Sequence, residues 1–173
     1  MHYTQTISSP LGSILLSADE VGLTGLWFDG GRYYAETLPE EHVERETPIL
    51  MDTKRWLDVY FTGREPDFTP LLHPTGSPFR QAVWQLLFEI PYGQTTTYGA
   101  LAKRLGGVRM SAQAVGGAVG HNPISIIVPC HRVVGANGSL TGYAGGLDRK
   151  IRLLEIEQTD MHGLFRPKKG TAI

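Results

Sequence analysis

The first part of the chain alternates hydrophobic and polar residues, as strands do. Residues 12–31 (GSILLSADEVGLTGLWFDGG) follow this pattern, with breaks at the acidic pair 19–20 and the glycine pair 30–31. Such breaks favour turns, so the segment predicts a hairpin of antiparallel strands. Residues 47–63 change to helical spacing after Thr47, which is suited to cap a helix. We expect this helix to cover a small sheet.

A change of composition predicts a domain boundary. Residues 64–78 contain four prolines and a glycine with little periodicity, which is typical of a connection. We therefore predict two domains, residues 1–78 and residues 79–173. The second begins with hydrophobic residues at helical spacing from 79 to 90, which indicates a core helix.

Two further short helices are predicted within residues 95–123. The first stops at the glycine pair 106–107, and Ser111 is placed to cap a second helix over 112–120. The pattern of helix, turn and helix resembles a helix-turn-helix. The second helix offers Gln113 as its one long polar side chain for reading bases. Its small residues suit either close approach to a narrow DNA groove or tight packing inside the protein.

The composition is ordinary, but the charge is unevenly distributed. Hydrophobic residues make up 41% and charged residues 19% of the chain, as in a soluble globular protein. The net charge is −1, yet residues 1–78 carry 5 Lys+Arg against 12 Asp+Glu and residues 79–173 carry 11 against 5. The basic half is suited to meet a polyanion. The alternative is that the two halves attract each other.

No stretch approaches the roughly 20 apolar residues that cross a bilayer. The start, MHYTQTISSP, lacks the basic and apolar regions of a signal peptide. We therefore expect no membrane contact and a cytoplasmic location, with the nucleoid or the nucleus as the site of action according to the kind of cell.

The single cysteine, Cys130, lies in the apolar run IIVPCHRVVG (126–135). One cysteine forms no internal disulfide, and the six histidines show no metal-binding spacing, so we expect no metal. A buried cysteine is most often an inert core residue. Here, however, Pro129 fixes the backbone and His131 follows directly. An imidazole with a carboxylate behind it raises the fraction of reactive thiolate.

Several ordered motifs now carry a resemblance. PCHRV (129–133) is preceded by AVGGAV (114–119) and HNP (121–123) and is followed by GYAGG (142–146). Over about 80 residues the C-terminal half resembles the O6-alkylguanine-DNA alkyltransferases. The resemblance implies an α+β fold. It has an N-terminal domain built on a small antiparallel sheet with helices, and a mostly helical C-terminal domain with a helix-turn-helix and an active-site loop.

The resemblance also implies the chemistry. An alkyl group on O6 of a damaged guanine would pass once, irreversibly, to Cys130, without a cofactor. His131 would take the thiol proton through a water, Glu157 would hold the imidazole, and Asn122 would order the network. Tyr98 would donate a proton toward the guanine ring. The residues expected to line the base are Val133, Tyr143, Ala144 and Gly145.

The implied partner is double-stranded DNA containing O6-alkylguanine, entered through the minor groove after the base is flipped out. We expect the protein to act as a monomer and leave open whether several molecules cluster on DNA. The expected DNA-contacting residues are Ala112, Gln113, Ala114, Gly116, Gly117, Lys103, Arg104, Arg109 and Arg132.

Two positions depart from the family pattern. Gln113 stands where an arginine commonly fills the gap left by the base, which predicts weaker DNA binding unless Arg109 substitutes. Ala144 stands where many members carry serine, so the range of lesions is expected to differ. Three rival functions remain: a binder of alkylated bases that does not repair them, a cysteine hydrolase, and a helix-turn-helix regulator.

Overall fold

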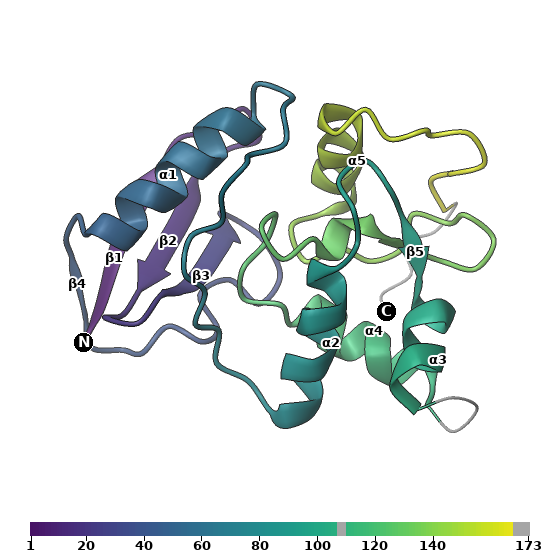
Figure 1. Ribbon diagram of the computed structural model, residues 1–173, viewed down its shortest axis with the longest axis horizontal. Helices are drawn as coiled ribbons and strands as arrows, with labels where there is room; N and C mark the ends of the chain where they lie inside the picture. The colour runs from purple at the N-terminus through teal and green to yellow at the C-terminus, as the bar shows by residue number, and fades with distance from the viewer. Residues whose placement is uncertain (107–109, 168–173) are drawn as a thin grey trace.

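The computed structural model describes residues 1–106 and 110–167 of the 173-residue chain. A four-stranded sheet forms the N-terminal part, in the order β3-β2-β1-β4. The strands are β1 (His2–Ile7), β2 (Ile14–Ala18), β3 (Leu23–Phe28) and β4 (His42–Glu44), and Figure 1 shows helix α1 (Pro48–Tyr60) lying across one face. The predicted hairpin is β2 and β3, which pair antiparallel.

The sheet is larger than the pattern predicted, because two of its strands carry a weak signal. Strand β1 pairs antiparallel with β2, whereas β4 adds to β1 in parallel. All three residues of β4 are exposed, so no buried position marks it in the sequence. The predicted antiparallel sheet therefore has one short parallel edge.

Helix α1 forms for the reasons that its sequence suggests. The Thr47 hydroxyl accepts a hydrogen bond from the amide of Leu50 (3.3 Å), and Pro48 occupies the first turn, where no backbone donor is needed. The buried face of the helix packs on the sheet and consists of Leu50, Thr53, Trp56, Leu57 and Tyr60. This face ends in a polar hydroxyl, on Tyr60, which points out of the N-terminal part.

The C-terminal part is mostly helical, which confirms the predicted α+β class. Its helices are α2 (Pro78–Phe88), α3 (Tyr98–Gly106), α4 (Ala112–Gly120) and α5 (Leu147–Ile156). Strands β5 (Thr96–Thr97) and β6 (Val133–Val134) form a small parallel pair. As predicted, Ser111 caps α4, accepting a hydrogen bond from the amide of Ala114 (3.0 Å). Among the described residues, no helix is long and apolar enough to cross a membrane.

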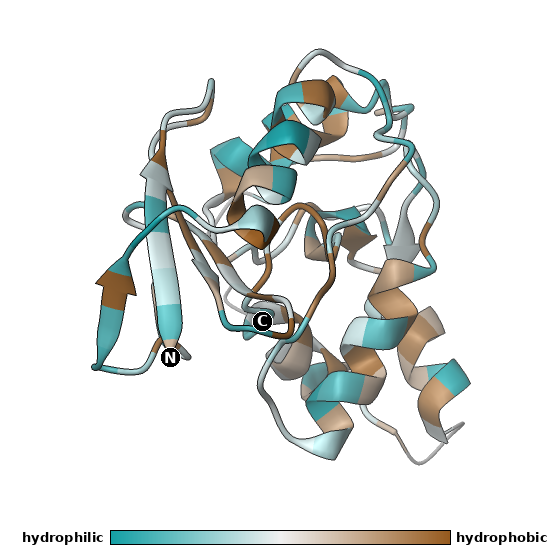
Figure 2. Cartoon of the chain, turned by 60° about the vertical axis from the view of Figure 1, so that its left-hand side comes forward, coloured by the Kyte–Doolittle hydropathy of each residue, from teal (hydrophilic) through white to brown (hydrophobic). Residues whose placement is uncertain are grey.

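The two parts share one hydrophobic core. Buried residues form a continuous cluster that runs from Ile14 in the sheet to Leu153 in α5. The backbone of Leu26 in β3 pairs with the segment before the cysteine, accepting from the amide of Ser125 (3.0 Å) and donating to the carbonyl of Pro123 (2.8 Å). Figure 2 shows the hydrophobic coil that lies between the sheet and the C-terminal helices. The sheet thus supports the segment that carries the thiol.

Arg149 of α5 forms a second link between the two parts. Its guanidinium donates to the carbonyls of Leu11 (2.9 Å), Asp29 (3.0 Å) and Gly145 (3.0 Å). It also lies over the ring of Phe28, 4.8 Å from the centroid. One side chain therefore holds two N-terminal turns against the loop that follows the active site.

We expect Arg149→Met to lower the free energy of unfolding by about 1–3 kcal/mol, because it removes charge-assisted hydrogen bonds to three carbonyls. Arg152→Met on the same helix is the control. Among the described residues, the only partner of Arg152 is Glu155, in an exposed ion pair at 4.0 Å, so its loss should change stability by less than about 0.5 kcal/mol. Urea unfolding of both variants measures the difference, and equal effects would contradict the linking role of Arg149.

Candidate active site

The thiol of Cys130 lies at the start of a single 3₁₀ turn, η2 (Cys130–Arg132). The turn follows Pro129 and the buried run 126–128, and Cys130 itself is only 4% exposed. Ile126 holds a positive φ of 70°, which is uncommon for a β-branched residue and is maintained by the surrounding packing. The backbone before the cysteine is therefore fixed by buried contacts.

Asn122 holds this segment together from within. Its side-chain amide donates to the carbonyls of Val128 (2.8 Å) and Ile124 (3.3 Å), and its side-chain oxygen accepts from the amide of Ile124 (3.0 Å). One buried side chain thus joins both ends of the run that leads to Cys130. This placement agrees with the ordering role expected from the sequence.

The predicted contact between His131 and Glu157 is present. Nε2 of His131 lies 2.6 Å from Oε2 of Glu157, and both side chains are fully buried. A carboxylate only accepts, so Nε2 carries the hydrogen and the neutral ring has its lone pair on Nδ1. Within the described part of the chain, Nδ1 has no hydrogen-bond partner. The ring is therefore oriented to accept a proton at Nδ1.

Arg132 requires a correction: the sequence predicts an exposed DNA contact for it, whereas the structure buries it in the interior. Its side chain points inward, and the residue is 8% exposed. Nε donates to Oε1 of Glu157 (2.8 Å), Nη2 donates to Oε2 (3.1 Å), and Nη1 donates to the carbonyl of Ile90 (2.7 Å). The buried carboxylate of Glu157 requires a compensating charge, and Arg132 supplies it.

Burial and nearby charges determine which of His131 and Glu157 carries a proton; we call this hydrogen-bonded pair the relay. Burial alone would raise the pKa of the Glu157 carboxyl, but the hydrogen bonds and charges of His131 and Arg132 hold it well below its ordinary 4.5. Burial lowers the pKa of His131 below its ordinary 6.5, against the opposing pull of Glu157. Near neutral pH the carboxyl is ionised and the imidazole is neutral.

Cys130 needs this neutral base. Burial raises the pKa of its thiol above the ordinary 9.0, although Asn122 and the charge of Lys150 pull the pKa down. Lys150 is fully buried, and its Nζ donates to the carbonyls of Val133 (2.6 Å) and Thr141 (2.7 Å). Burial lowers the pKa of Lys150 to about 8. The resting thiol is therefore mainly protonated, and its reaction requires a proton acceptor.

Two family models match the chain: "6-O-methylguanine DNA methyltransferase, ribonuclease-like domain" over residues 1–73 and "6-O-methylguanine DNA methyltransferase, DNA binding domain" over residues 78–159. The chain belongs to the 6-O-methylguanine DNA methyltransferase family. This confirms the resemblance found in the sequence. The division of the chain at residue 78 stays a prediction.

Individual relatives cover nearly the whole chain. The methylated-DNA–protein-cysteine methyltransferase of Methanosarcina acetivorans is 48% identical, over 90% of this chain and 97% of the relative. That of Haemophilus influenzae is 41% identical, over 91% and 87%. The crystal structure of Mycobacterium tuberculosis OGT in complex with DNA matches with a TM-score of 0.80 at 41% identity, over 90% and 92% of the two chains. The protein is thus a DNA-binding methyltransferase of this family.

Tyr98 and Val133, both expected to act on the guanine base, are buried. Tyr98, at the start of α3, has its hydroxyl 3.4 Å from the carbonyl of Thr141 and 3.5 Å from that of Gly142. Burial raises the pKa of Tyr98 well above its ordinary 10.0, so the phenol keeps its proton. The carbonyl of Val133 already accepts from Lys150. It has a second lone pair for a base amine.

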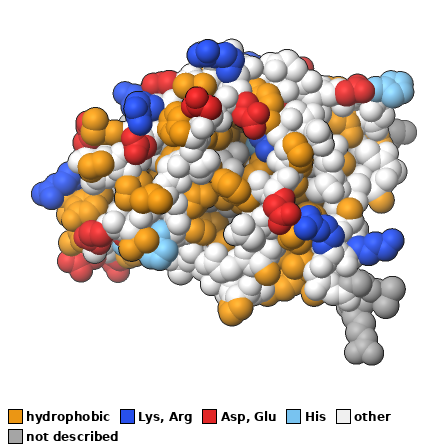
Figure 3. Space-filling model, viewed as in Figure 1, with side chains coloured by type: hydrophobic (Ala, Val, Ile, Leu, Met, Phe, Trp, Pro, Cys, Tyr) orange, Lys and Arg blue, Asp and Glu red, His pale blue; other side chains and the backbone are white. Residues whose placement is uncertain are grey.

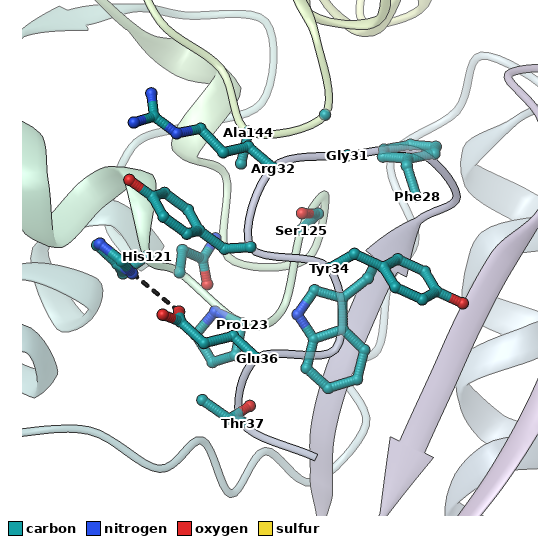
Figure 4. A pocket seen from close by; sticks show the side chains of 14 residues that line it. Phe28, Gly31, Arg32, Tyr34, Glu36, Thr37, His121, Pro123, Ser125 and Ala144 are labelled. Carbon is teal, nitrogen blue, oxygen red and sulfur yellow. Dashed lines mark hydrogen bonds and ion pairs between the residues drawn. The ribbon is translucent and has the colours of Figure 1, made fainter. Parts of the chain in front are cut away.

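The sequence did not reveal how the N-terminal part meets the loop of Tyr143, Ala144 and Gly145. The amide of Arg32 donates to the carbonyl of Ala144 (2.7 Å). Tyr33 stacks on His121, with ring centroids 3.8 Å apart, and Nδ1 of His121 lies 2.8 Å from Oε2 of Glu36. Figure 4 shows Arg32, Glu36, His121 and Ala144 around a small pocket. No pattern in residues 29–38 predicts this contact.

The residues of α4 that are expected to face DNA divide between surface and interior. Ala112, Gln113 and Ala114 are exposed at the start of α4, whereas Gly116 is buried against the protein. For Gly116 the alternative of tight internal packing is therefore correct. Gly117 is half-buried with open space beside it.

Of the three basic residues expected to contact phosphates, the structure describes two. Lys103 and Arg104 are exposed in the last turn of α3, where Arg104 pairs with Glu89 (3.2 Å). Arg109 lies outside the described residues. On the face in Figure 3, basic and acidic side chains are interspersed. Among the described residues, no group of three or more His, Cys, Asp or Glu could hold a metal ion.

The buried relay should make the folded state sensitive to acid. The unfolded chain binds protons at His131 near pH 6.5 and at Glu157 near pH 4.5, whereas the folded chain resists both. The unfolded state thus binds more protons at low pH, and stability falls as the pH falls through these values. We expect the free energy of unfolding, measured in urea from pH 8 to pH 3.5, to decrease below pH 6.5.

Glu157→Gln isolates the carboxyl contribution. Below about pH 5 the variant should lose stability with a shallower slope than the wild type, because its side chain does not titrate. An equally steep slope in both proteins would show that Glu157 is not held ionised in the folded state.

Proposed function

We propose that this protein repairs DNA by moving the alkyl group from O6 of guanine in duplex DNA to Cys130. One observation supports the proposal above all: a thiol, an imidazole and a carboxylate, on Cys130, His131 and Glu157, are buried in a member of this family, and the last two are hydrogen-bonded. The sulfur–carbon bond forms as the bond between the alkyl carbon and O6 breaks. The products are a thioether on Cys130 and an unmodified guanine. The proton lost by the thiol is replaced on the guanine, so the step balances.

His131 serves as the base that frees the thiolate. The thiol is protonated at rest, and the lone pair on Nδ1 of His131 is the acceptor that the fold leaves available. A water between the two groups would relay the proton. Glu157 stabilises the imidazolium that results. Tyr98 keeps its proton until the guanine ring acquires negative charge, and then donates it.

The substrate base must leave the helix stack to react. Cys130 is 4% exposed, so a base inside a duplex does not reach it, and flipping costs a few kcal/mol. The exposed start of α4 presents the small residues Ala112 and Ala114 beside Gln113. This smooth surface suits the minor groove, with Lys103 and Arg104 near the phosphates. Specificity then comes from the chemistry of the lesion, not from base sequence.

Each molecule acts once. The S–alkyl bond of a thioether is stable, because a thiolate is a poor leaving group from an alkyl carbon, so water does not restore the thiol. Each molecule removes one lesion. We further propose that the protein does so as a monomer on duplex DNA.

Stoichiometry tests the proposal. Protein mixed with excess duplex containing O6-methylguanine should gain one methyl group per molecule, on the peptide of Cys130, as measured by mass spectrometry. Cys130→Ser should gain none and leave the lesion intact. Product in excess of protein would indicate a turning-over hydrolase instead. Tight binding of the lesion without modification would indicate a binder that does not repair.

Gln113 should support the flipped state. We expect Gln113→Ala to slow transfer from duplex DNA about fivefold or more, since losing about 1 kcal/mol changes a rate about fivefold. Gln113→Arg should accelerate transfer from duplex. The control substrate is free O6-methylguanine, which needs no flipping and should react equally with all three proteins. Equal single-turnover rates on duplex would refute this role of Gln113.

A further inference from the structure

The hydroxyl of Tyr60 reaches the carboxylate of the active site from the other half of the chain. Tyr60 ends α1, is fully buried, and lies 97 positions before Glu157. Its Oη donates to Oε2 of Glu157 at 2.6 Å. Neither the sequence pattern nor the proposed chemistry assigns this tyrosine a role beyond the core.

Tyr60 and His131 share one carboxylate oxygen. Oε2 of Glu157 accepts from Oη of Tyr60 (2.6 Å), Nε2 of His131 (2.6 Å) and Nη2 of Arg132 (3.1 Å). Oε1 accepts from Nε of Arg132 (2.8 Å) and the amide of Gly93 (3.3 Å). Each hydrogen bond donated to Oε2 partly neutralises the carboxylate, and this weakens its electrostatic effect on the imidazole of His131.

Aromatic packing fixes the hydroxyl in place. The ring of Tyr60 stacks on Trp56 with centroids 5.2 Å apart, and it meets Phe61 and Tyr92 edge-on at 5.4 Å and 6.4 Å. The ring is buried and packed between these neighbours, which holds its hydroxyl against Glu157. The hydrogen bond is therefore a fixed part of the site.

We propose that Tyr60 is a positioning residue for alkyl transfer, which fixes Glu157 and weakens its pull on the His131 proton so that the imidazole stays free to act as the base. The proposal rests on the proposed function. It gives the acidic N-terminal half a part in the chemistry: the half supplies a neutral donor to the buried carboxylate.

Other charged and titratable groups also face the relay. Arg132 and Lys150 lower the pKa of His131, and Glu157 raises it. The ring of Tyr143 lies edge-on to His131 at 6.4 Å. Within the part of the chain that the structure describes, the thiol of Cys130 acts on Tyr143, and the charge of Glu65 acts on the phenol of Tyr92. Removing only the Tyr60 hydroxyl leaves all of these in place.

The test is the pH dependence of single-turnover transfer by full-length Tyr60→Phe. Without the hydroxyl, Glu157 pulls harder on the proton of His131, so the imidazole stays protonated to higher pH. At pH 6 we expect the rate to fall about three- to tenfold relative to the wild type, whereas at pH 8.5 the two rates should agree within about twofold. A rate that falls equally at every pH, or an unchanged profile, would overturn the proposal.

Tyr92→Phe is the matched control. It removes a hydroxyl from the adjacent ring, whose nearest acceptor is the carbonyl of Ile156 at 3.5 Å, not a carboxylate. Its pH profile should therefore follow the wild type. A shift equal to that of Tyr60→Phe would mean that any loss in this aromatic cluster moves the profile, against a specific role for Tyr60.

A titration of the His131 imidazole by NMR tests the link without using activity. Tyr60→Phe should raise the His131 pKa in the wild-type background and leave it unchanged in the Glu157→Gln background, because the effect passes through that carboxylate. A shift that persists without the carboxylate would contradict the proposal. If the wild type transfers no alkyl group, the proposed function fails, and this titration still decides whether Tyr60 tunes His131.

Discussion

The buried carboxylate of Glu157 is the interaction on which the rest of this structure depends. An ionised carboxylate inside a protein is stable only when charge and hydrogen bonds replace water around it. Arg132, His131, Tyr60 and the amide of Gly93 do so here, and they come from three separate segments of the chain. The position of the imidazole, and through it the state of the thiol, follows from satisfying this one group.

Much of the fold could be predicted from periodicity. The helices that begin at Thr47 and Ser111 are marked by their caps and hydrophobic spacing, and both are present. Strand β4 carries no such signal, because its three residues are exposed and join the sheet at its edge by pairing with β1. Hydrophobic periodicity marks an element that has one buried face. An edge strand without a buried face has no such periodicity, so the sequence does not predict it.

The site residues that lie within one stretch of sequence could be predicted from its motifs. The contacts between segments that are distant in the sequence could not. Asn122, Cys130 and His131 lie close together in one motif-rich stretch. Arg132 adjoins His131 and was assigned to DNA, since an arginine is most often exposed. Only the three-dimensional structure shows that its guanidinium turns inward to Glu157. The contribution of Tyr60 depends on a contact across 97 positions, which no window of sequence contains.

The pairing of Leu26 with Pro123 and Ser125 has a consequence for the independence of the two halves. All six residues of β3 are buried, and this strand is an edge strand of the four-stranded sheet. Leu23 pairs with residues 71–73 of the N-terminal half itself, but in an N-terminal fragment expressed alone the backbone groups of Leu26 would lose their partners. An apolar edge with free backbone groups favours self-association between molecules. The C-terminal half therefore covers part of this edge of the sheet, and the sheet in return supports the run that leads to the thiol.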